Sequence, residues 1–548
     1  MTHPDFPAPT LEAPSDFRGI FRADLTARAR YAEGAGIARC VPQAVAVPAD
    51  VDDVACLVRW AKRCGVALIP RGSGSGMAAG AVGPGVMVDV SRFRHMGPVE
   101  VAGRRIRVGA GVTQRAIDQA ARAHGLRFPV DPSSGAFCTI GGMVATNAAG
   151  ARSLAFGATR PWVLGVQAVF DDGTAVWIHR EQPLPETPAI VRLLRALEEI
   201  RRGVAPSHLV HPGVRKESSG YGIAAALAPG GHLVDLLVAS EGTLAVFTEI
   251  EVALCPVAGG VATVLATFPS LEHATACAIE ARADGAVACE LLDRTFLDVA
   301  ESGAPTGIPS HAEAVLLVEL EGENHAHAAS AAVHFADRCR GHGALDVNTA
   351  TDPADAHRLW ALRHAASPIL AQLAPRLRSM QFIEDGCVPP AQFPAYVRGV
   401  RRALDAAGIR GVIFGHAGDA HAHVNPLVDT TQPGWRDRVY GLLSDVCALT
   451  ASLGGTLAGE HGDGRLRAPL WPSVWSLEAR AAFAQIKAAA DPALVLNPGC
   501  KVAADDARPF TMLRHDPEAP ALPDDARAAL DAIERERAWD RWRLDGIT

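Results

Sequence analysis

The chain contains 548 residues, of which 49% are hydrophobic and 20% are charged. This balance supports a large buried core and excludes a disordered protein, and at about 150 residues per domain the length predicts three or four folding units. The formal net charge is −8. Because binding to a nucleic-acid backbone requires clustered positive charge, we expect no nucleic-acid partner.

The cysteines and the N-terminus bear on the cellular compartment. The 11 cysteines form no Cys-x-x-Cys pair, and an odd, scattered set is typical of reduced thiols. Residues 1–17 contain no basic region followed by an apolar run, and no uncharged apolar stretch of about 18 residues occurs. We therefore predict a cytoplasmic protein, with peripheral contact with the inner face of a membrane left open.

The first regular pattern follows an N-terminal extension, residues 1–37, that is Pro-rich at its start. Residues 41–50 predict a strand that leads into a helix over 51–64. Asp50 is the expected N-cap of this helix, and Gly65 is expected to end it.

Short strands and a second helix come next. VALIP, residues 66–70, predicts a buried strand, and residues 85–91 and 104–111 predict two more. A helix with Thr113 as its N-cap and Gly125 as its stop follows.

Strand patterns then alternate with loops. Residues 163–170 and 174–179 predict strands, and residues 236–254 close this half of the chain with alternating apolar residues.

The pattern of residue types changes near residue 256. Ala-rich helical stretches alternate with strands such as 313–322 and 411–418, a pattern typical of an α+β domain. We divide the chain into an extension, two domains and a charged helical tail: 1–37, 38–255, 256–502 and 503–548.

A glycine-rich loop follows the VALIP strand. In RGSGSG, Arg71 to Gly76, three glycines alternate with two serines, which allows several backbone N–H groups to turn toward one anion. A Rossmann loop would open a helix, but the following MAAGAVGPG is too rich in glycine and proline. An anion-binding nest and a plain surface loop both remain open.

A second glycine-rich segment, Asp131 to Ser153, favours a cofactor site. It carries four glycines among small residues: Gly135, Gly141, Gly142 and Gly150. Small residues allow the backbone to approach a flat ligand closely.

Four motifs together resemble a known family: residues 41–76, then TIGGMVATNAAG, FGATRPWVLGVQAVFDDG and SEGTLAVFTEIEVAL. They are similar to the PCMH-type FAD-binding domain of the vanillyl-alcohol-oxidase superfamily, and most similar to its FAD-linked D-2-hydroxyacid dehydrogenases, which act on D-lactate, D-2-hydroxyglutarate or glycolate. The resemblance covers about residues 38–502. It implies an α+β fold in which 38–255 form a two-subdomain FAD-binding domain and 256–502 form a substrate (cap) domain with an antiparallel sheet.

The same resemblance implies which residues hold the cofactor. Arg71, Gly72, Ser73, Gly74, Ser75 and Gly76 would cradle the FAD pyrophosphate. Other positions would line the cofactor, the last two nearer its adenine end: Ser133, Ser134, Thr139, Gly141, Gly142, Ala145, Gly150, Gly157, Gly242 and Ile250. The loop contains no His or Cys, so non-covalent FAD is expected.

A histidine-rich stretch, IFGHAGDAHAHVNP, carries potential metal ligands. If AHAHVN is a strand, His421, His423 and Asn425 point to one face. A polar loop that happens to be rich in histidine is the alternative.

GTLAGEHGDGRLR adds Glu460 and His461, flanked by Gly459 and Gly462. The glycines permit a tight bend, so that both side chains can serve one site. Histidine and carboxylate ligands suit a divalent metal such as zinc or manganese. HExxH is absent, so a metalloprotease is not expected.

The resemblance implies roles for these residues: metal ligation by His416, His423 and Glu460, the base role for His461, and substrate contact for Asn147 and Asn425. Position 421 is usually Asn in the family. A histidine there offers either a further ligand or a polar neighbour.

Arg363 and Ser367 lie one turn apart in a predicted helix, LWALRHAASPIL. A solvated helix arginine is the plain interpretation, whereas the resemblance implies that Arg363 holds the substrate carboxylate, with Ser367 beside it. The lysine that reads a distal carboxylate in the 2-hydroxyglutarate branch is not evident, although Arg378 lies nearby. QFIEDGCVPP resembles relatives that continue into an iron–sulfur domain, which makes a separate iron–sulfur subunit a candidate partner.

The resemblance thus implies FAD-dependent oxidation of a D-2-hydroxy acid to a 2-oxo acid, with Arg363 and His461 as catalytic residues. The candidate electron acceptors are a quinone, an electron-transfer flavoprotein, a cytochrome or an iron–sulfur subunit, and a homodimer is left open. The alternatives are an FAD oxidase of another alcohol that uses O₂, a metal-dependent hydrolase built on the His/Glu cluster, and a non-catalytic FAD-binding subunit.

Overall fold

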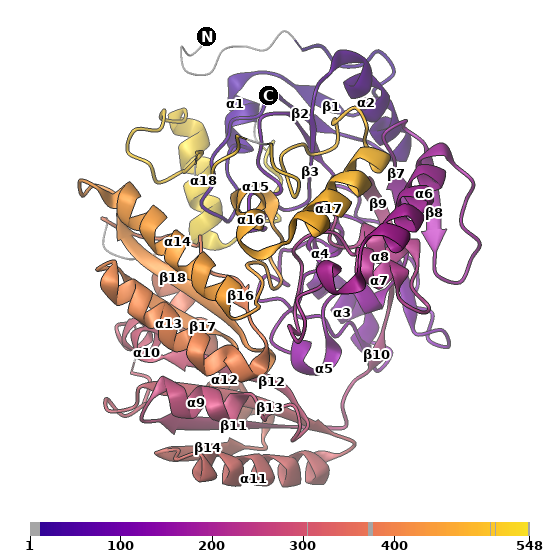
Figure 1. Ribbon diagram of the computed structural model, residues 1–548. Helices are drawn as coiled ribbons and strands as arrows, with labels where there is room; N and C mark the ends of the chain where they lie inside the picture. Colours follow the sequence, from indigo (N-terminus) through magenta and orange to yellow (C-terminus); the bar gives the residue numbers. More distant parts are fainter. Residues whose placement is uncertain (1–10, 304, 371–375, 505, 510, 546–548) are drawn as a thin grey trace.

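The computed structural model describes residues 11–303, 305–370, 376–504, 506–509 and 511–545, apart from the side chains of residues 364–370. The chain folds into two halves (Figure 1). The first half contains a mixed sheet and an antiparallel sheet, and the second is built on one large antiparallel sheet. The predicted α+β class is confirmed.

The mixed sheet has the strand order β1-β2-β4-β3, in which only β1 runs antiparallel. Its strands are β1 (Ile20–Arg22), β2 (Ala44–Val47), β3 (Leu68–Arg71) and β4 (Val86–Asp89). Helix α2 (Val51–Cys64) connects β2 to β3 and confirms the predicted boundaries. Asp50 accepts hydrogen bonds from the backbone N–H groups of the first turn, and Gly65 is left-handed with φ of 65°.

The antiparallel sheet of the first half has the order β5-β9-β7-β8. Its strands are β5 (Arg105–Gly109), β7 (Val163–Val169), β8 (Ala175–His179) and β9 (Val246–Ala253), and a separate pair is formed by β6 (Leu126–Arg127) and β10 (Cys255–Pro256). Helix α3 (Gln114–Arg122) begins after Thr113 as predicted but ends before Gly125. The expected strand pattern over 236–254 starts only at Val246, because the preceding residues belong to helix α8 (Leu233–Leu237) and a turn.

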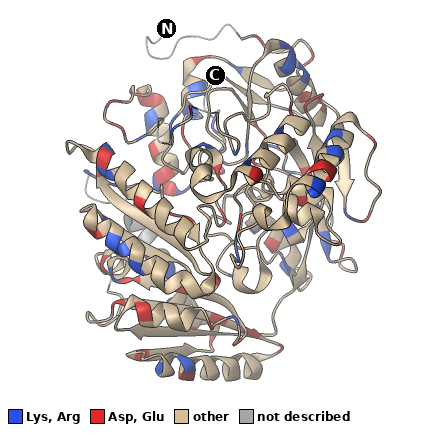
Figure 2. Cartoon of the chain, viewed as in Figure 1, with Lys and Arg blue, Asp and Glu red and all other residues tan. Residues whose placement is uncertain are grey.

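The remaining helices of the first half pack around these sheets. They are α1 (Leu25–Arg30), α4 (Ile140–Thr146), α5 (Ser153–Phe156), α6 (Pro188–Gly203), α7 (Ile223–Leu227) and α8 (Leu233–Leu237). Outer helices such as α6 carry charges of both signs (Figure 2).

The large sheet has the order β14-β11-β13-β12-β17-β18-β15, with β16 paired to β18. Its strands are β11 (Gly260–Phe268), β12 (Ala286–Asp293), β13 (Ala314–Gly322), β14 (Asp346–Ala350), β15 (Leu377–Ser379), β16 (Gly386–Cys387), β17 (Arg410–His416) and β18 (His421–Asp429). The predicted strand over AHAHVN is therefore confirmed.

Helices cover both faces of this sheet, and alternate strand residues contact different helices. Val264 and Leu316 face a layer formed by α9 (Leu271–Ala278), α11 (His325–Gly341), α13 (Phe393–Ala406) and α14 (Trp435–Ser452). Leu265 and Leu317 face α10 (Arg294–Glu301) and α12 (Pro353–Leu370). The site described below lies on the α10/α12 face.

The chain then returns to the first half. Helices α15 (Gly464–Arg467), α16 (Trp471–Val474) and α17 (Leu477–Ala490) follow the large sheet, and Trp475, Phe483 and Leu496 belong to the hydrophobic core of the first half. The packing of residues 471–496 thus differs from the predicted division, which kept 256–502 together.

The two terminal segments are also packed. Residues 20–37, expected as an extension, contribute β1 and the fully buried Tyr31. The predicted tail helix is confirmed as α18 (Asp524–Glu536), and its Leu530 packs against Ala29 and Ala32. Apolar positions within both segments explain this packing.

None of the described helices is long and apolar enough to cross a membrane. All 11 cysteines are free, as expected for reduced thiols.

Candidate active site

One cavity of about 1330 Å³ is lined by residues of both halves. Its walls are the glycine loop after β3, the segment 131–152, the β17/β18 region of the large sheet, and residues of the C-terminal segment. The volume exceeds the roughly 300–1,000 Å³ of an ordinary small-molecule site. It therefore has room for a dinucleotide and a small substrate together.

The glycine loop forms the first wall of the cavity, and the Arg71 side chain holds the loop in place. The Arg71 side chain is buried and donates hydrogen bonds to the carbonyl groups of Tyr31, Glu33 and Ala81 at 3.3, 2.8 and 3.1 Å. The backbone N–H groups of residues 73–76 have no acceptor among the described residues. The loop is thus a candidate anion-binding nest, held by a buried guanidinium.

Replacing Gly74 by alanine is expected to lower the free energy of unfolding by about 1–3 kcal/mol and to reduce FAD content. Gly74 is left-handed with φ of 75°, and a Cβ atom there would lie 2.3 Å from Arg71 Nη2. Thermal unfolding of the apoprotein measures the change. Gly76→Ala is the control, because its Cβ meets no atom within 4 Å. Equal stability of G74A and wild type would contradict the prediction.

The second wall is the small-residue segment 131–152, and it is tied to the large sheet. Thr139 caps helix α4. Arg152 pairs with Asp131 at 2.5 Å and, through two nitrogens, with Glu319 of β13 at 2.6 and 2.8 Å. One side chain thereby links the two halves beside the cavity.

Most of the predicted cofactor-binding residues line this cavity: Arg71, Gly72, Ser73, Gly74, Ser75, Gly76, Ser133, Ser134, Thr139, Gly141, Gly142, Ala145, Gly150 and Gly242.

Three predicted ligand-binding residues are not among those that line the cavity. Ile250 is fully buried in β9, between β5 and β7. Gly157 follows α5 as its C-cap. Asn147 is the left-handed C-cap of α4, and its side chain is used within the fold, since it accepts a hydrogen bond from Arg160 N at 2.9 Å.

The three predicted metal ligands meet on the cavity wall. His416 Nε2 lies 3.1 Å from Glu460 Oε1, His423 Nε2 lies 3.3 Å from the same oxygen, and the two nitrogens are 3.4 Å apart. Ligand atoms held about 2.1 Å from one ion are separated by about 3.0–3.4 Å at octahedral to tetrahedral angles. The spacing of the three atoms fits a divalent metal.

Both histidines are oriented for ligation through Nε2. His416 Nδ1 donates to Glu290 Oε1 at 2.6 Å, and His423 Nδ1 donates to the Glu384 carbonyl at 2.8 Å. Such partners fix the imidazole orientation in metal sites. Burial lowers the pKa of His416, but Glu290 outweighs it and raises the pKa to about 9. Metal binding at His416 would therefore release a proton.

Glu290 is a site residue that the sequence analysis missed. The register of the sheet places Glu290 opposite His416, and its second oxygen accepts a hydrogen bond from Arg363 Nε at 2.7 Å. Burial opposes ionisation, but His416 and Arg363 hold the pKa of Glu290 below its usual range. A carboxylate in the middle of the apolar stretch AVACELL was the available signal.

Lys216 is a second site residue that the sequence analysis missed. Its Nζ lies 2.6 Å from Glu460 Oε2, and both side chains are buried. Burial opposes ionisation of Glu460, but Lys216 and His416 hold the pKa of this carboxyl well below its usual range. Glu460 is therefore an anion, with Oε1 turned to the histidines and Oε2 to the lysine.

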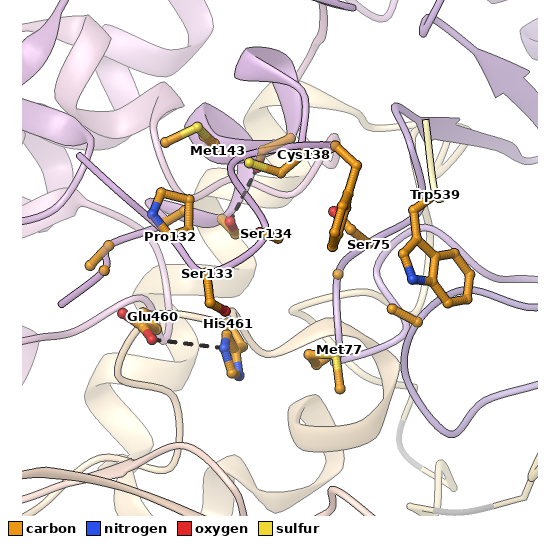
Figure 3. A pocket seen from close by; sticks show the side chains of 18 of the residues that line it. Ser75, Met77, Pro132, Ser133, Ser134, Cys138, Met143, Glu460, His461 and Trp539 are labelled. Carbon is orange, nitrogen blue, oxygen red and sulfur yellow. Dashed lines mark hydrogen bonds and ion pairs between the residues drawn. The ribbon is translucent and has the colours of Figure 1, made fainter. Parts of the chain in front are cut away.

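His461 points into the same site as Glu460, as the flanking glycines predict (Figure 3). Its Nδ1 lies 3.1 Å from Glu384 Oε1, and its Nε2 lies 3.8 Å from Glu460 Oε1. Its backbone N–H donates to Asp385 at 2.9 Å. Burial lowers the pKa of His461, but Asp385 and Glu384 outweigh it and raise the pKa. The imidazole is partly exposed.

His421 shares the β18 face with His423 and lies in the same cluster. Its Nε2 is 2.9 Å from Asp385 Oδ1, while its Nδ1 is buried without a partner among the described residues. Burial lowers the pKa of His421 to about 3, so the ring is neutral.

Arg363 lines the cavity beside Phe414, whose ring centre is 4.8 Å from the guanidinium carbon. Glu290 takes the Nε side of the guanidinium, and its two terminal nitrogens have no partner among the described residues. Asn425 lies on the cavity wall two residues beyond His423. The side chain of Ser367 lies outside the described residues.

Two glycine-rich walls and a His/Glu cluster thus line one cavity. The model of the FAD binding domain matches residues 42–179, and the model of FAD linked oxidases, C-terminal domain, matches residues 260–500. The chain belongs to the FAD-linked oxidase family.

Relatives with named activities cover most of the chain. The glycolate oxidase subunit GlcD of Escherichia coli K12 is 30% identical over 85% of each chain. The D-lactate dehydrogenase of Archaeoglobus fulgidus is 31% identical over 83% of this chain and 90% of its own length. The D-2-hydroxyglutarate dehydrogenase of Pseudomonas putida is 29% identical over 88% of this chain and 50% of its own.

Solved structures share the fold. The 4-ethylphenol oxidase from Gulosibacter chungangensis superposes with a TM-score of 0.64 at 16% identity, over 90% of this chain and 95% of that one. An alkyldihydroxyacetonephosphate synthase gives 0.59 at 14% identity, over 87% and 82%. At this identity the likeness concerns the fold alone.

Proposed function

We propose that the protein oxidises a D-2-hydroxy acid, of the D-lactate or D-2-hydroxyglutarate type, to the 2-oxo acid by hydride transfer to FAD. The single cavity carries this proposal, because the glycine walls and the His/Glu cluster face the same space. The relatives named for glycolate, D-lactate and D-2-hydroxyglutarate support the substrate class.

The residues present fit both groups that this chemistry needs. The free N–H groups of residues 73–76 suit a pyrophosphate, and His416, His423 and Glu460 have the donor types and spacing for zinc or manganese. When bound, FAD supplies the hydride acceptor and the metal supplies Lewis acidity. A separate acceptor then takes the electrons.

Arg363 would fix the substrate. Its two terminal nitrogens form a planar fork that matches a carboxylate, while Glu290 holds the Nε side. Asn425, which lines the same cavity, would contact the bound acid.

His461 would take the proton of the substrate hydroxyl at Nε2. Glu384 holds Nδ1 and thereby leaves Nε2 facing the cluster. A positioned base of this kind typically contributes about 10²–10⁴ in rate.

The test is anaerobic mixing of the yellow protein with a panel of D-hydroxy acids and their L-enantiomers. We expect at least one D-acid to bleach the flavin absorbance while its L-enantiomer does not. A flavin that stays oxidised with every acid, or a protein purified without flavin, would contradict the proposal.

Removing the metal is expected to abolish substrate oxidation without releasing FAD, because the three ligands belong to the cluster and not to the glycine walls. The protein is dialysed against a chelator, and flavin spectrum, metal content and turnover are measured. Adding back zinc or manganese should restore turnover. Full activity of metal-free protein would remove the metal from the mechanism.

A further inference from the structure

The C-terminal segment after residue 500 lies outside both matched family models, yet it reaches the cavity. Seven residues of this segment line it: Arg514, His515, Asp531, Glu534, Arg535, Arg537 and Trp539. Family resemblance assigns no role to them.

The end of α18 positions Trp539. Arg537 adopts a left-handed conformation with φ of 52° and ends the helix, and Ala538 N then donates back to the Ile533 carbonyl. This turn directs Trp539 toward the cavity (Figure 3). The backbone geometry at the end of α18 therefore fixes the position of the indole.

Trp539 packs beside both glycine-rich walls. Its indole is 7% exposed and packs in one cluster with Phe137, Ile533 and Ala35. Ala35 N donates to the Gly74 carbonyl of the nest at 3.0 Å, and Phe137 precedes the cap of α4 by two residues. Ala35, Phe137 and Trp539 all line the cavity. A nucleotide held by the nest would thus meet the indole.

Arg543 lies behind Trp539. Its guanidinium carbon is 5.2 Å from the Trp539 ring centre, the side chain is 4% exposed, and its two terminal nitrogens are buried without partners among the described residues. Burial lowers the pKa of Arg543, and the cation of Arg71 lowers it further, to about 9. The carboxylates of Asp89 and Glu33 also lie near Arg543. An anion bound at the nest would offset a further part of the cost of burying the two cations.

The first half anchors this segment through its own arginines. Arg94 donates to the Asp540 carbonyl at 3.0 Å, and Arg30 donates to the carbonyls of Arg543 and Asp545 at 3.3 and 2.7 Å. These hydrogen bonds hold the C-terminal segment against the first half of the chain.

We propose that residues 531–543 are part of the FAD-binding site, with Trp539 in contact with the bound cofactor and Arg543 positioning that ring and adding charge for the cofactor's pyrophosphate. The inference rests on FAD binding alone, so its test needs no hydroxy acid and is separate from the test of the reaction.

The first experiment titrates FAD into FAD-stripped wild type, Trp539→Ala, Arg543→Ala and Arg541→Ala. The control Arg541 belongs to the same segment but is 44% exposed and pairs with Glu536. We expect W539A and R543A to raise the FAD dissociation constant at least about tenfold, and R541A to leave it unchanged. Dissociation constants of W539A and R543A within about twofold of R541A would overturn the proposal.

The second experiment remains informative if the alanine variants fold poorly. Trp539→Phe keeps an aromatic ring in the cluster but removes one of nine tryptophan emitters. If flavin contacts Trp539, its emission is quenched in the holoprotein. W539F should then be dimmer than wild type as apoprotein and equally bright as holoprotein. If W539F were dimmer than wild type by the same amount as apoprotein and as holoprotein, contact between Trp539 and the flavin would be contradicted.

Discussion

Replacing His461 by alanine is expected to slow flavin reduction by a D-2-hydroxy acid about 10²–10⁴-fold while FAD stays bound. The imidazole is the proposed base, with Nδ1 held by Glu384 and Nε2 turned toward the cluster. Removing it takes away the group that accepts the hydroxyl proton. Stopped-flow absorbance under anaerobic conditions measures the rate.

The control for this variant is His334→Ala, a histidine whose side chain is 68% exposed on α11, away from the cavity. H334A should reduce its flavin at the wild-type rate. H461A with the wild-type rate and bound metal would show that another group takes the proton.

Replacing Arg363 by alanine should lower kcat/KM about 10²–10⁴-fold, because two charge-assisted hydrogen bonds to the substrate carboxylate are lost. Arg363→Lys keeps the charge but not the planar fork, so it should recover only part of the loss. The FAD spectrum should be unchanged in both variants. Steady-state kinetics with an artificial electron acceptor measures the effect.

Arg358 on the same helix provides the matched control, since its side chain is 76% exposed and pairs with Asp355. R358A should match wild type. An R363A variant whose KM and kcat both equal those of R358A would place the substrate carboxylate elsewhere.

Local signals in the sequence predict much of the fold. Asp50 and Gly65 mark both ends of α2 because capping depends on adjacent residues only. The alternation in AHAHVN correctly predicts β18, and the flanking glycines correctly place Glu460 and His461 in one site.

The partners of these residues could not be predicted, because they come from distant parts of the chain. Glu290 meets His416 through the pairing of β12 with β17, 126 positions apart. Lys216 reaches Glu460 across 244 positions from a segment without a recognisable pattern. Buried charges of this kind depend on tertiary packing, and only the position of Glu290 among apolar strand residues hinted at one of them.

The packing of the two terminal segments could not be predicted from the sequence either. The beginning and the helix near the end look like appendages, because proline is frequent in the first residues and charged residues are frequent in the helix. Tyr31 is nevertheless fully buried, and Leu522 and Leu530 bury their side chains against α1. Composition alone does not reveal that such residues complete the core of another part of the chain.

The most direct test of the account is anaerobic flavin reduction by a D-2-hydroxy acid with deuterium at C2, using protein that carries both FAD and metal. The account predicts that the flavin bleaches and that the deuterated acid bleaches it more slowly, since the C2 hydrogen leaves as hydride in the cavity shared by the glycine walls and the His/Glu cluster. A fully loaded protein whose flavin stays yellow with every such acid would contradict it.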